Sequence, residues 1–214
     1  MGSQTLKDKQ ERLKEIIYIL KKEYPSSKCS LVYDSPFQLL VATILSAQCT
    51  DERVNKVTKK LFKKYPTVYD YLELKVKDLG KLIYSTGFYN NKSKSIKGLC
   101  KMLVKEYDGN VPSDINLLTK LPGVGRKTAN VVLGNYYSIP SLVVDTHVTR
   151  ISNLLKMSKS RNAVVIERDL QKIVNKLDWV IFTHLIIDHG RKVCIANRPK
   201  CDLCISKDYC PSAK

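Results

Sequence analysis

Residues 121–127 read Leu-Pro-Gly-Val-Gly-Arg-Lys, a turn with two glycines that leads directly into a helical pattern. A short helical pattern, Ser113 to Thr119, precedes the turn, and Thr128 to Leu133 follows it as a second helix that Gly134 is expected to end. Glycines on either side of one buried valine let the backbone pass close to another group and point its N–H groups outward. At the positive end of a helix dipole, such N–H groups are suited to bind a phosphate.

The composition indicates a globular protein with a polyanionic partner. The chain has 214 residues, 43% of them hydrophobic, and 37 Lys and Arg against 20 Asp and Glu give a net charge of +17. That excess of positive charge, together with the turn at 121–127, predicts nucleic-acid binding. The first ten residues lack a signal-peptide core, and no apolar run approaches the roughly 18–20 residues of a membrane span, so we expect a cytoplasmic protein with no membrane partner.

Apolar residues recur at helical spacing along most of the chain, so the predicted fold class is all-α. The β-prone run Leu142-Val143-Val144 is too short to make a sheet. Ser35, Asp51 and Asp145 are expected to cap helices. The expected helices are Leu6–Tyr24, Phe37–Ala47, Glu52–Lys64, Asn91–Tyr107, Asp145–Met157, Ala163–Leu177 and Trp179–His189, the last of them ended by Gly190.

Lys127 lies in the first turn of the helix that follows the glycines, where the helix dipole repels its charge. One interpretation is a surface lysine that reaches a phosphate. The other is a nucleophile, because the dipole, partial burial and the adjacent Arg126 would all disfavour the ammonium form. Only the neutral amine can attack a carbon atom and form a Schiff base.

A second candidate follows the short apolar run at 142–144. Asp145 is by position an N-cap, and a carboxylate held rigidly at a helix start can also stabilise positive charge in a neighbouring active site. His147 stands two residues further on. For this histidine a structural or phosphate-contacting role is expected rather than general-base catalysis.

Four cysteines form the third constellation, in the pattern Cys194-x6-Cys201-x2-Cys204-x5-Cys210. In a reducing compartment, such a cluster indicates a metal rather than disulfides, and four thiolates accept either Zn²⁺ or a [4Fe–4S] cluster. A structural role is expected, since four ligands leave no position for substrate. Basic residues that could contact phosphate lie beside and between the cysteines, namely Arg191, Arg198 and Lys200. The other cysteines, Cys29, Cys49 and Cys100, are expected to be small core residues.

These elements, in this order, resemble the endonuclease III family, whose members are bifunctional DNA glycosylase/AP lyases of base excision repair. The turn and its two helices, about 114–135, resemble the helix-hairpin-helix motif of that family. The matching segments are Ser-Pro-Phe at 35–37, Leu-Ser-Ala-Gln at 45–48, Leu-Pro-Gly-Val-Gly-Arg-Lys-Thr-Ala at 121–129, Val-Asp-Thr-His at 144–147, His-Gly-Arg at 189–191 and the four-cysteine tail.

The resemblance implies a fold of two helical lobes. One is a six-helix barrel domain at 29–139, which contains the hairpin, and the other is a helical domain of 1–28 and 140–214. The resemblance also implies that the four cysteines hold a [4Fe–4S] cluster rather than zinc. Lys127 and Asp145 would face each other across a cleft between the lobes.

The resemblance further implies the substrate and the reaction. A monomeric enzyme would bind damaged double-stranded DNA and extrude an oxidised pyrimidine. Lys127 would attack the anomeric carbon, and β-elimination would cut the strand on the 3′ side. Gln48 would fill the gap in the duplex, and Phe88, where the family usually has leucine, would act as a wedge beside the orphaned base. Phosphate contacts are expected from Gly123, Gly125, Arg126, His147, Arg191, Arg198 and Lys200.

Two alternatives remain open at this point. A monofunctional mismatch glycosylase of the same superfamily would share the hairpin, the aspartate and the cluster, but it typically lacks the hairpin lysine. A non-catalytic DNA-binding module with a metal knuckle would account for the charge, the hairpin and the cysteines, but not for the joint presence of Lys127 and Asp145.

Overall fold

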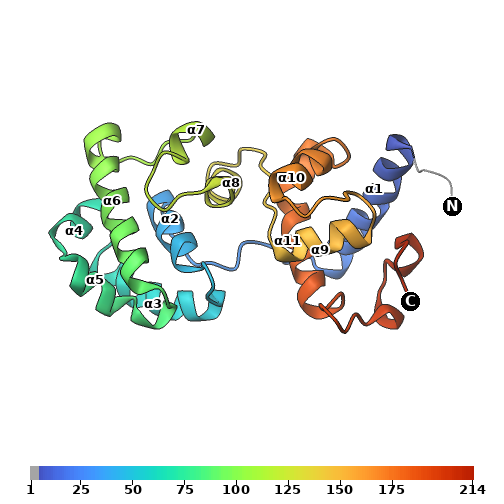
Figure 1. Ribbon diagram of the computed structural model, residues 1–214, viewed down its shortest axis with the longest axis horizontal. Helices are drawn as coiled ribbons and strands as arrows, with labels where there is room; N and C mark the ends of the chain where they lie inside the picture. Colours follow the sequence, from blue (N-terminus) through green and yellow to red (C-terminus); the bar gives the residue numbers. More distant parts are fainter. Residues whose placement is uncertain (1–4) are drawn as a thin grey trace. The chain divides into compact units, whose positions relative to one another are not determined.

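The computed structural model describes residues 5–214, and helices make up all the regular secondary structure of this range (Figure 1). The predicted all-α class is therefore confirmed, and the run Leu142-Val143-Val144 forms no strand. The Val143 N–H donates instead to the Thr183 hydroxyl at 3.2 Å. None of the described helices is long and apolar enough to cross a membrane. The described chain divides into two compact units, which we call unit 1, the residues up to Lys28 with Pro140–Lys214, and unit 2, Cys29–Ile139. Residues 1–4 of the expected first range lie outside the described residues.

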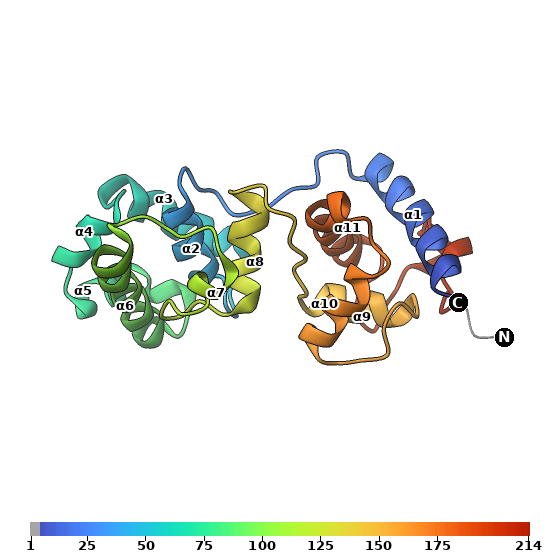
Figure 2. The ribbon, with the colours of Figure 1, turned by 90° about the horizontal axis from the view of Figure 1, so that it is seen from above.

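Unit 2 is built around a helix that is buried on all sides. Helix α2 (Pro36–Leu45) buries every residue from Phe37 to Leu45, which is typical of a helix that is apolar all round. Figure 2 shows α3 (Asp51–Lys64), α6 (Tyr89–Tyr107) and α8 (Arg126–Asn135) around it. The other helices of the unit are α4 (Val68–Glu73), α5 (Val76–Leu82), the 3₁₀ turn η1 (Tyr84–Thr86) and α7 (Ile115–Leu118).

Unit 1 joins the two ends of the described chain. Helix α1 (Leu6–Glu23) buries an apolar stripe that includes Leu13, Ile16 and Leu20, and it packs against α11 (Trp179–Lys192). Helix α11 also packs against α9 (Thr146–Leu154). The remaining elements are α10 (Ala163–Gln171) and the 3₁₀ turns η2 (Lys176–Asp178), η3 (Cys201–Leu203) and η4 (Lys207–Tyr209).

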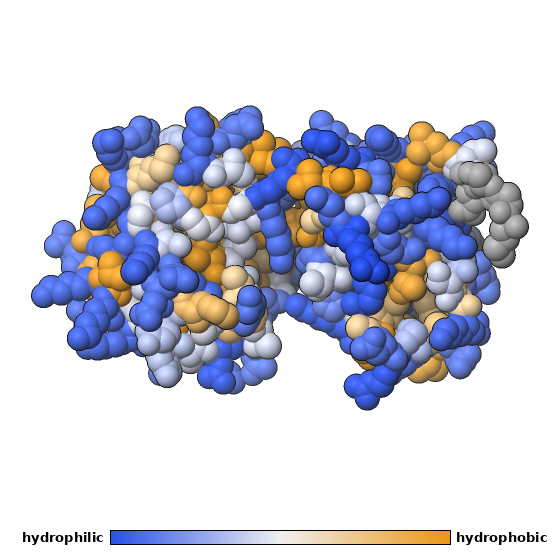
Figure 3. Space-filling view, viewed as in Figure 1, coloured by the Kyte–Doolittle hydropathy of each residue, from blue (hydrophilic) through white to orange (hydrophobic). Residues whose placement is uncertain are grey.

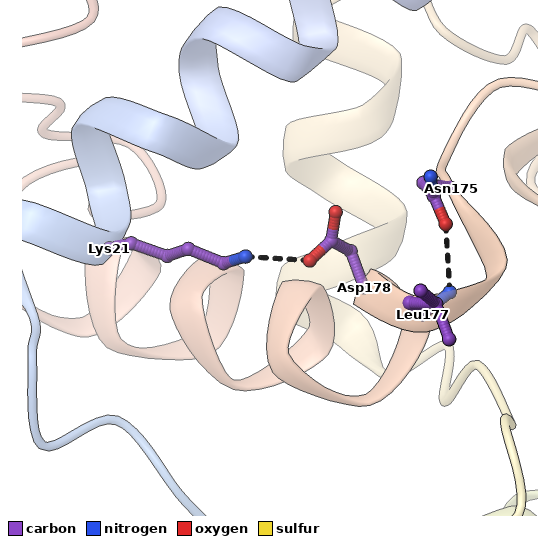
Figure 4. Close-up of polar contacts among 4 residues, drawn as sticks. All are labelled: Lys21, Asn175, Leu177 and Asp178. Carbon is purple, nitrogen blue, oxygen red and sulfur yellow. Dashed lines mark hydrogen bonds and ion pairs between the residues drawn. The ribbon is translucent and has the colours of Figure 1, made fainter.

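Polar contacts fix α1 to later parts of unit 1. The Lys21 ammonium lies 2.6 Å from an Asp178 carboxylate oxygen and ties α1 to η2 (Figure 4). The Arg12 guanidinium donates to the carbonyl of Leu155 at 2.7 Å and to that of Tyr209 at 2.9 Å. Hydrophilic side chains cover much of the visible face of each unit, as the high net charge predicts (Figure 3).

Helix starts agree with the sequence at two of the three expected caps. The side chains of Ser35 and Asp145 accept bonds from the backbone N–H groups of Gln38 and Val148, so both predictions are confirmed. The prediction for Asp51 is wrong, because the Thr50 hydroxyl is the cap and Asp51 is the first helical residue. The Asp51 carboxylate instead accepts a hydrogen bond from Ser30 at 2.8 Å.

Three predicted helix ends are wrong for identifiable reasons. Gly134 and Gly190 lie inside α8 and α11, because a glycine ends a helix only where it adopts a left-handed conformation, and neither does so. Helix α10 ends at Gln171 rather than at Leu177. The apolar spacing continues through the buried Ile173 and Val174, but the Asn175 side chain accepts a bond from the Leu177 N–H and starts a separate turn (Figure 4).

Candidate active site

The two glycines of the hairpin, which we define as residues 119–125 between α7 and α8, serve different purposes. Gly123 has φ +78°, and a Cβ there would lie 2.7 Å from the Cβ of Ser95 on α6. Only glycine fits both the left-handed backbone and this close approach. Gly125 has φ −88° and open space where a Cβ would point. The valine between them, Val124, is 5% exposed and buried as predicted.

The start of α8 is open for an incoming anion. Gly125 is its N-cap, and no side chain caps this end. The backbone N–H groups of the first turn therefore remain available, with the positive end of the dipole behind them. Arg126 is exposed beside them and adds a further positive charge. This arrangement suits a phosphate oxygen.

Lys127 lies in the first turn of α8, as predicted, but it is exposed rather than partly buried. The buried residues near the start of α8 are Ala129 and Asn130. The prediction that partial burial makes the Lys127 amine more reactive is therefore wrong. Its ammonium forms no hydrogen bond or ion pair with any residue that the structure describes. The start of the helix dipole and the exposed Arg126 remain beside it.

Two exposed turns of unit 2 carry the residues expected to enter the duplex. Gln48 follows the end of α2 with φ 54°, and Phe88 is the N-cap of α6 with φ 49°. Both side chains are exposed, Phe88 to 61%. A left-handed conformation is uncommon for residues other than glycine and is held only where the surrounding structure enforces it.

Asp145 opens α9 in unit 1 and is half-buried. One carboxylate oxygen, Oδ1, accepts a bond from the Val148 N–H at 2.8 Å. The other oxygen has no hydrogen-bond partner among residues 5–214, so it can act on a bound molecule. The cap thus fixes the carboxylate without using all of its acceptor capacity.

Helix α9 also contacts the segment that carries the cysteines. Arg150 donates to the Cys194 carbonyl at 2.6 Å, and its guanidinium lies 3.4 Å from Nδ1 of His147. Gly190 of α11 allows this close packing, since a Cβ there would lie 2.7 Å from the same ring nitrogen. His147 is therefore part of the packing between α9 and α11, which fits the structural role considered for it. Arg150 was not identified from the sequence, although its i,i+3 spacing from His147 is a usable signal.

The four cysteines help to line one cavity of about 310 Å³. The first of them, Cys194, follows the end of α11 at Lys192. No group of three or more His, Cys, Asp or Glu in the described range is arranged to hold a metal ion. The space is far larger than the roughly 10–15 Å³ that one water-sized body needs. Other side chains of unit 1, such as Arg150 and His189, line the rest of this cavity. Of the other cysteines, Cys100 is buried, and Cys29 and Cys49 pack against the core of unit 2.

The Cys194 thiol of this cavity is disfavoured in its negatively charged form. Burial raises the pKa of the Cys194 thiol, and the neighbouring Cys210, Cys204 and Cys201 raise it further against the effect of Arg150. A bound cation would reverse this balance, because it stabilises thiolate ligands directly. His189 lies 3.6 Å from the Cys204 sulfur and 3.3 Å from the Tyr24 hydroxyl, so both of its ring nitrogens have partners.

The remaining basic residues expected at DNA are Arg191, at the end of α11, and Arg198 and Lys200, in the loop between the first two cysteines. All three are exposed. They belong to unit 1, with Asp145 and His147, whereas Lys127, Gln48 and Phe88 belong to unit 2. That Lys127 faces Asp145 stays a prediction.

The described fold is all-helical, and its hairpin leads into helix α8, which has no side-chain cap and carries Lys127. With the four-cysteine loop, these features are typical of the helix-hairpin-helix class of DNA-binding proteins. Residues 41–176 match the HhH-GPD superfamily of base excision DNA repair proteins, and the chain belongs to that superfamily. It is 51% identical to the endonuclease III of Synechocystis sp., over 96% of this chain and 94% of that protein.

Two solved structures extend the similarity to the fold. One is a non-covalent endonuclease III–DNA complex, with a TM-score of 0.91 and 42% identity over 95% of this chain and 96% of that one. The other is a trapped endonuclease III–DNA covalent intermediate with an estranged adenine, with a TM-score of 0.90 and 43% identity over the same shares. The fold and the family expected from the sequence are thus confirmed.

Proposed function

We propose that this protein is a base excision repair DNA glycosylase and AP lyase that removes oxidised pyrimidines from duplex DNA. The observation that carries the proposal is Lys127, an exposed lysine without a partner among the described residues, in the first turn of the uncapped helix α8. The trapped covalent intermediate formed by a relative of 43% identity supports it. Unit 2 would be the six-helix barrel domain, and unit 1 the domain of the cluster.

The reaction begins with the binding of damaged duplex DNA. The N–H groups of the hairpin and Arg126 hold a phosphate. Gln48 occupies the space of the extruded nucleotide, and Phe88 acts as a wedge beside the orphaned base. Arg191, Arg198 and Lys200 add phosphate contacts from unit 1, and His147 supports the helix that carries Asp145. This binding follows from the positive charge and the exposed hairpin.

Lys127 then acts as the nucleophile. Its neutral amine attacks the anomeric carbon, the glycosidic bond breaks, and the base leaves with the electron pair and takes up a proton. The sugar ring opens and leaves a protonated imine. Loss of a proton from the neighbouring carbon supplies the electrons that expel the 3′ phosphate oxygen, which cuts the strand. The free oxygen of Asp145 stabilises the cationic intermediate.

The proposed cofactor is a [4Fe–4S] cluster held by Cys194, Cys201, Cys204 and Cys210, since these four thiols line one cavity of about 310 Å³. When bound, it supplies metal–thiolate bonds that order the loop 194–210. Visible absorbance with equal amounts of iron and sulfide would support the cluster, whereas zinc gives neither. With DNA as the substrate, we propose a cytoplasmic location, at the nucleoid in a prokaryotic cell.

Borohydride trapping tests the enzyme on duplexes that contain either thymine glycol or an abasic site. The wild type should give a covalent adduct with both, and Lys127→Ala should give none while it still binds DNA. Asp145→Asn keeps a capping side chain, so it should fold normally but turn over far more slowly. An adduct with Lys127→Ala would refute the nucleophile. Binding without an adduct on either duplex would leave the monofunctional glycosylase or the DNA-binding module.

A further inference from the structure

Lys92 is a buried lysine on α6 that the mechanism above does not use. Its side chain is 5% exposed, and its ammonium donates to the carbonyl of Leu45 at 2.8 Å and to that of Thr86 at 2.7 Å. No carboxylate lies within ion-pair distance of it in the described part of the chain. Burial of a charge is costly, and here backbone carbonyls alone offset that cost.

The two carbonyls stand shortly before the two residues expected at the damaged site, in segments that we call the Gln48 turn, residues 45–48, and the Phe88 turn, residues 86–88. Leu45 is the last residue of α2, three positions before Gln48, and Thr86 ends η1, two positions before Phe88. The backbone N–H of Lys92 also donates to the Phe88 carbonyl at 3.0 Å. That bond is the ordinary first-turn bond of α6, whereas the two side-chain bonds of Lys92 link the Phe88 turn to the Gln48 turn.

Both turns need such support, because their key residues are left-handed. Gln48 has φ 54° and Phe88 has φ 49°, and Gly87 before it has φ 71°. Non-glycine residues keep this conformation only where their surroundings fix it. Burial also lowers the pKa of Lys92, so the protein maintains this contact at an electrostatic cost.

We propose that Lys92 is a positioning residue for damage recognition. Its ammonium fixes the Gln48 turn relative to the Phe88 turn, so that Gln48 fills the gap in the duplex while Phe88 acts as a wedge beside the orphaned base. This inference rests on the proposed function, since it takes the gap-filling role of Gln48 and the wedge role of Phe88 from there. It concerns unit 2 alone and does not involve Lys127.

The same helix provides a matched control. Lys97 is 9% exposed, and its ammonium donates to the carbonyls of Tyr71 at 2.7 Å and Leu72 at 2.9 Å, both in α4. It is thus a second buried lysine with two carbonyl acceptors, but it does not contact either turn. Lys92→Met and Lys97→Met remove comparable interactions, and both should lower the stability of unit 2.

The test compares the full-length variants on DNA. The first readout is the ratio of Kd values for an intact duplex and for a duplex with a tetrahydrofuran abasic analogue. The second is the fluorescence of 2-aminopurine placed opposite that analogue, which reports whether side chains fill the gap. Lys92→Met should reduce the preference for the abasic analogue by about tenfold, as expected for a lost bond to a charged group. Lys97→Met should leave the preference and the fluorescence change as in the wild type.

A double-substituted background separates positioning from general damage to the fold. With Gln48→Ala and Phe88→Ala present, Lys92→Met should cause no further loss of preference. An equal loss in Lys97→Met, or a full additional loss in the double-substituted background, would overturn the proposal. If Lys92→Met does not fold, Lys92→Gln and Lys97→Gln give the same comparison. An amide keeps two donors that reduce the cost to the fold, but it is uncharged and on a shorter side chain, so the charged bonds to the two carbonyls are still lost. A wild type that does not prefer the abasic analogue would instead refute the proposed function, and the inference with it.

Discussion

Gly123→Ala tests the physical account of the hairpin most directly. The new methyl group would sit on a backbone with φ +78° and 2.7 Å from the Ser95 Cβ. The left-handed conformation costs alanine about 1–2 kcal/mol, and overpacking in a close contact costs about 1–3 kcal/mol. We therefore expect a loss of about 2–5 kcal/mol in the free energy of unfolding of unit 2.

The control is Gly125→Ala, where φ is −88° and a Cβ would meet nothing. Replacement of an N-cap glycine by alanine weakens the cap, but it also reduces the entropy of the unfolded chain, and the two effects are both about 0.5–1 kcal/mol. Stability should change little. DNA binding should nevertheless weaken, because the methyl group would stand where a phosphate is expected.

Thermal unfolding followed by far-UV circular dichroism measures the difference. For a chain of this size about 1 kcal/mol corresponds to about 2–4 °C, so Gly123→Ala should lower Tm by about 4–20 °C and Gly125→Ala by very little. Adding Ser95→Gly to Gly123→Ala should recover the clash energy but not the cost of the left-handed backbone. A Gly123→Ala variant as stable as the wild type would refute the reasoning.

Three further predictions concern unit 1. Gly190→Ala places a Cβ 2.7 Å from Nδ1 of His147, so urea denaturation should show a loss of about 1–3 kcal/mol, and an unchanged midpoint would contradict the tight packing of α9 and α11. Burial lowers the pKa of His184 below 6.5, so below that pH the unfolded chain binds a proton that the folded chain does not. The free energy of unfolding should therefore fall as the pH drops below 6.5, with a slope of up to about 1.4 kcal/mol per pH unit, and His184→Gln should reduce this slope. Neutralising Arg198 and Lys200 should reduce the slope of log Kd against log salt by somewhat under two units, at roughly 0.9 per phosphate contact. Neutralising two exposed lysines of α3 is the control. An equal reduction of the slope in that variant would show that the cysteine loop is not part of the DNA interface.

The sequence predicted correctly those features of the fold, such as helix starts, that depend only on residues within one helical turn of each other. Ser35 before a proline and Asp145 before an apolar pattern identify helix starts, because the capping bond is made within three residues. Gly190 was misread for a complementary reason. Its role depends on His147, which packs against it from another helix, and a glycine required for packing looks the same in sequence as one that ends a helix.

The candidate site shows the same limit. The glycines, Lys127 and the four cysteines are recognisable by spacing, but the exposure of Lys127 is not. Lys92 and Lys97 were missed entirely, because in a lysine-rich chain a lysine on a helix reads as a solvent-exposed residue. Only the tertiary structure shows that the acceptors of Lys92 come from a different helix and a different turn.

The Arg12 contacts with Leu155 and Tyr209 cannot form until the chain has been made as far as residue 209, so unit 1 is completed only after unit 2 has been synthesised. Unit 2 is one continuous segment, so its helices can pack as soon as they leave the ribosome. Helix α1 precedes unit 2 in the chain, but its main partner, α11, follows unit 2. The apolar stripe with Leu13, Ile16 and Leu20 therefore lacks its native partner until the chain beyond unit 2 has been made. A cysteine loop that fails to form leaves the core around α1 without the packing of Cys194 and Cys210.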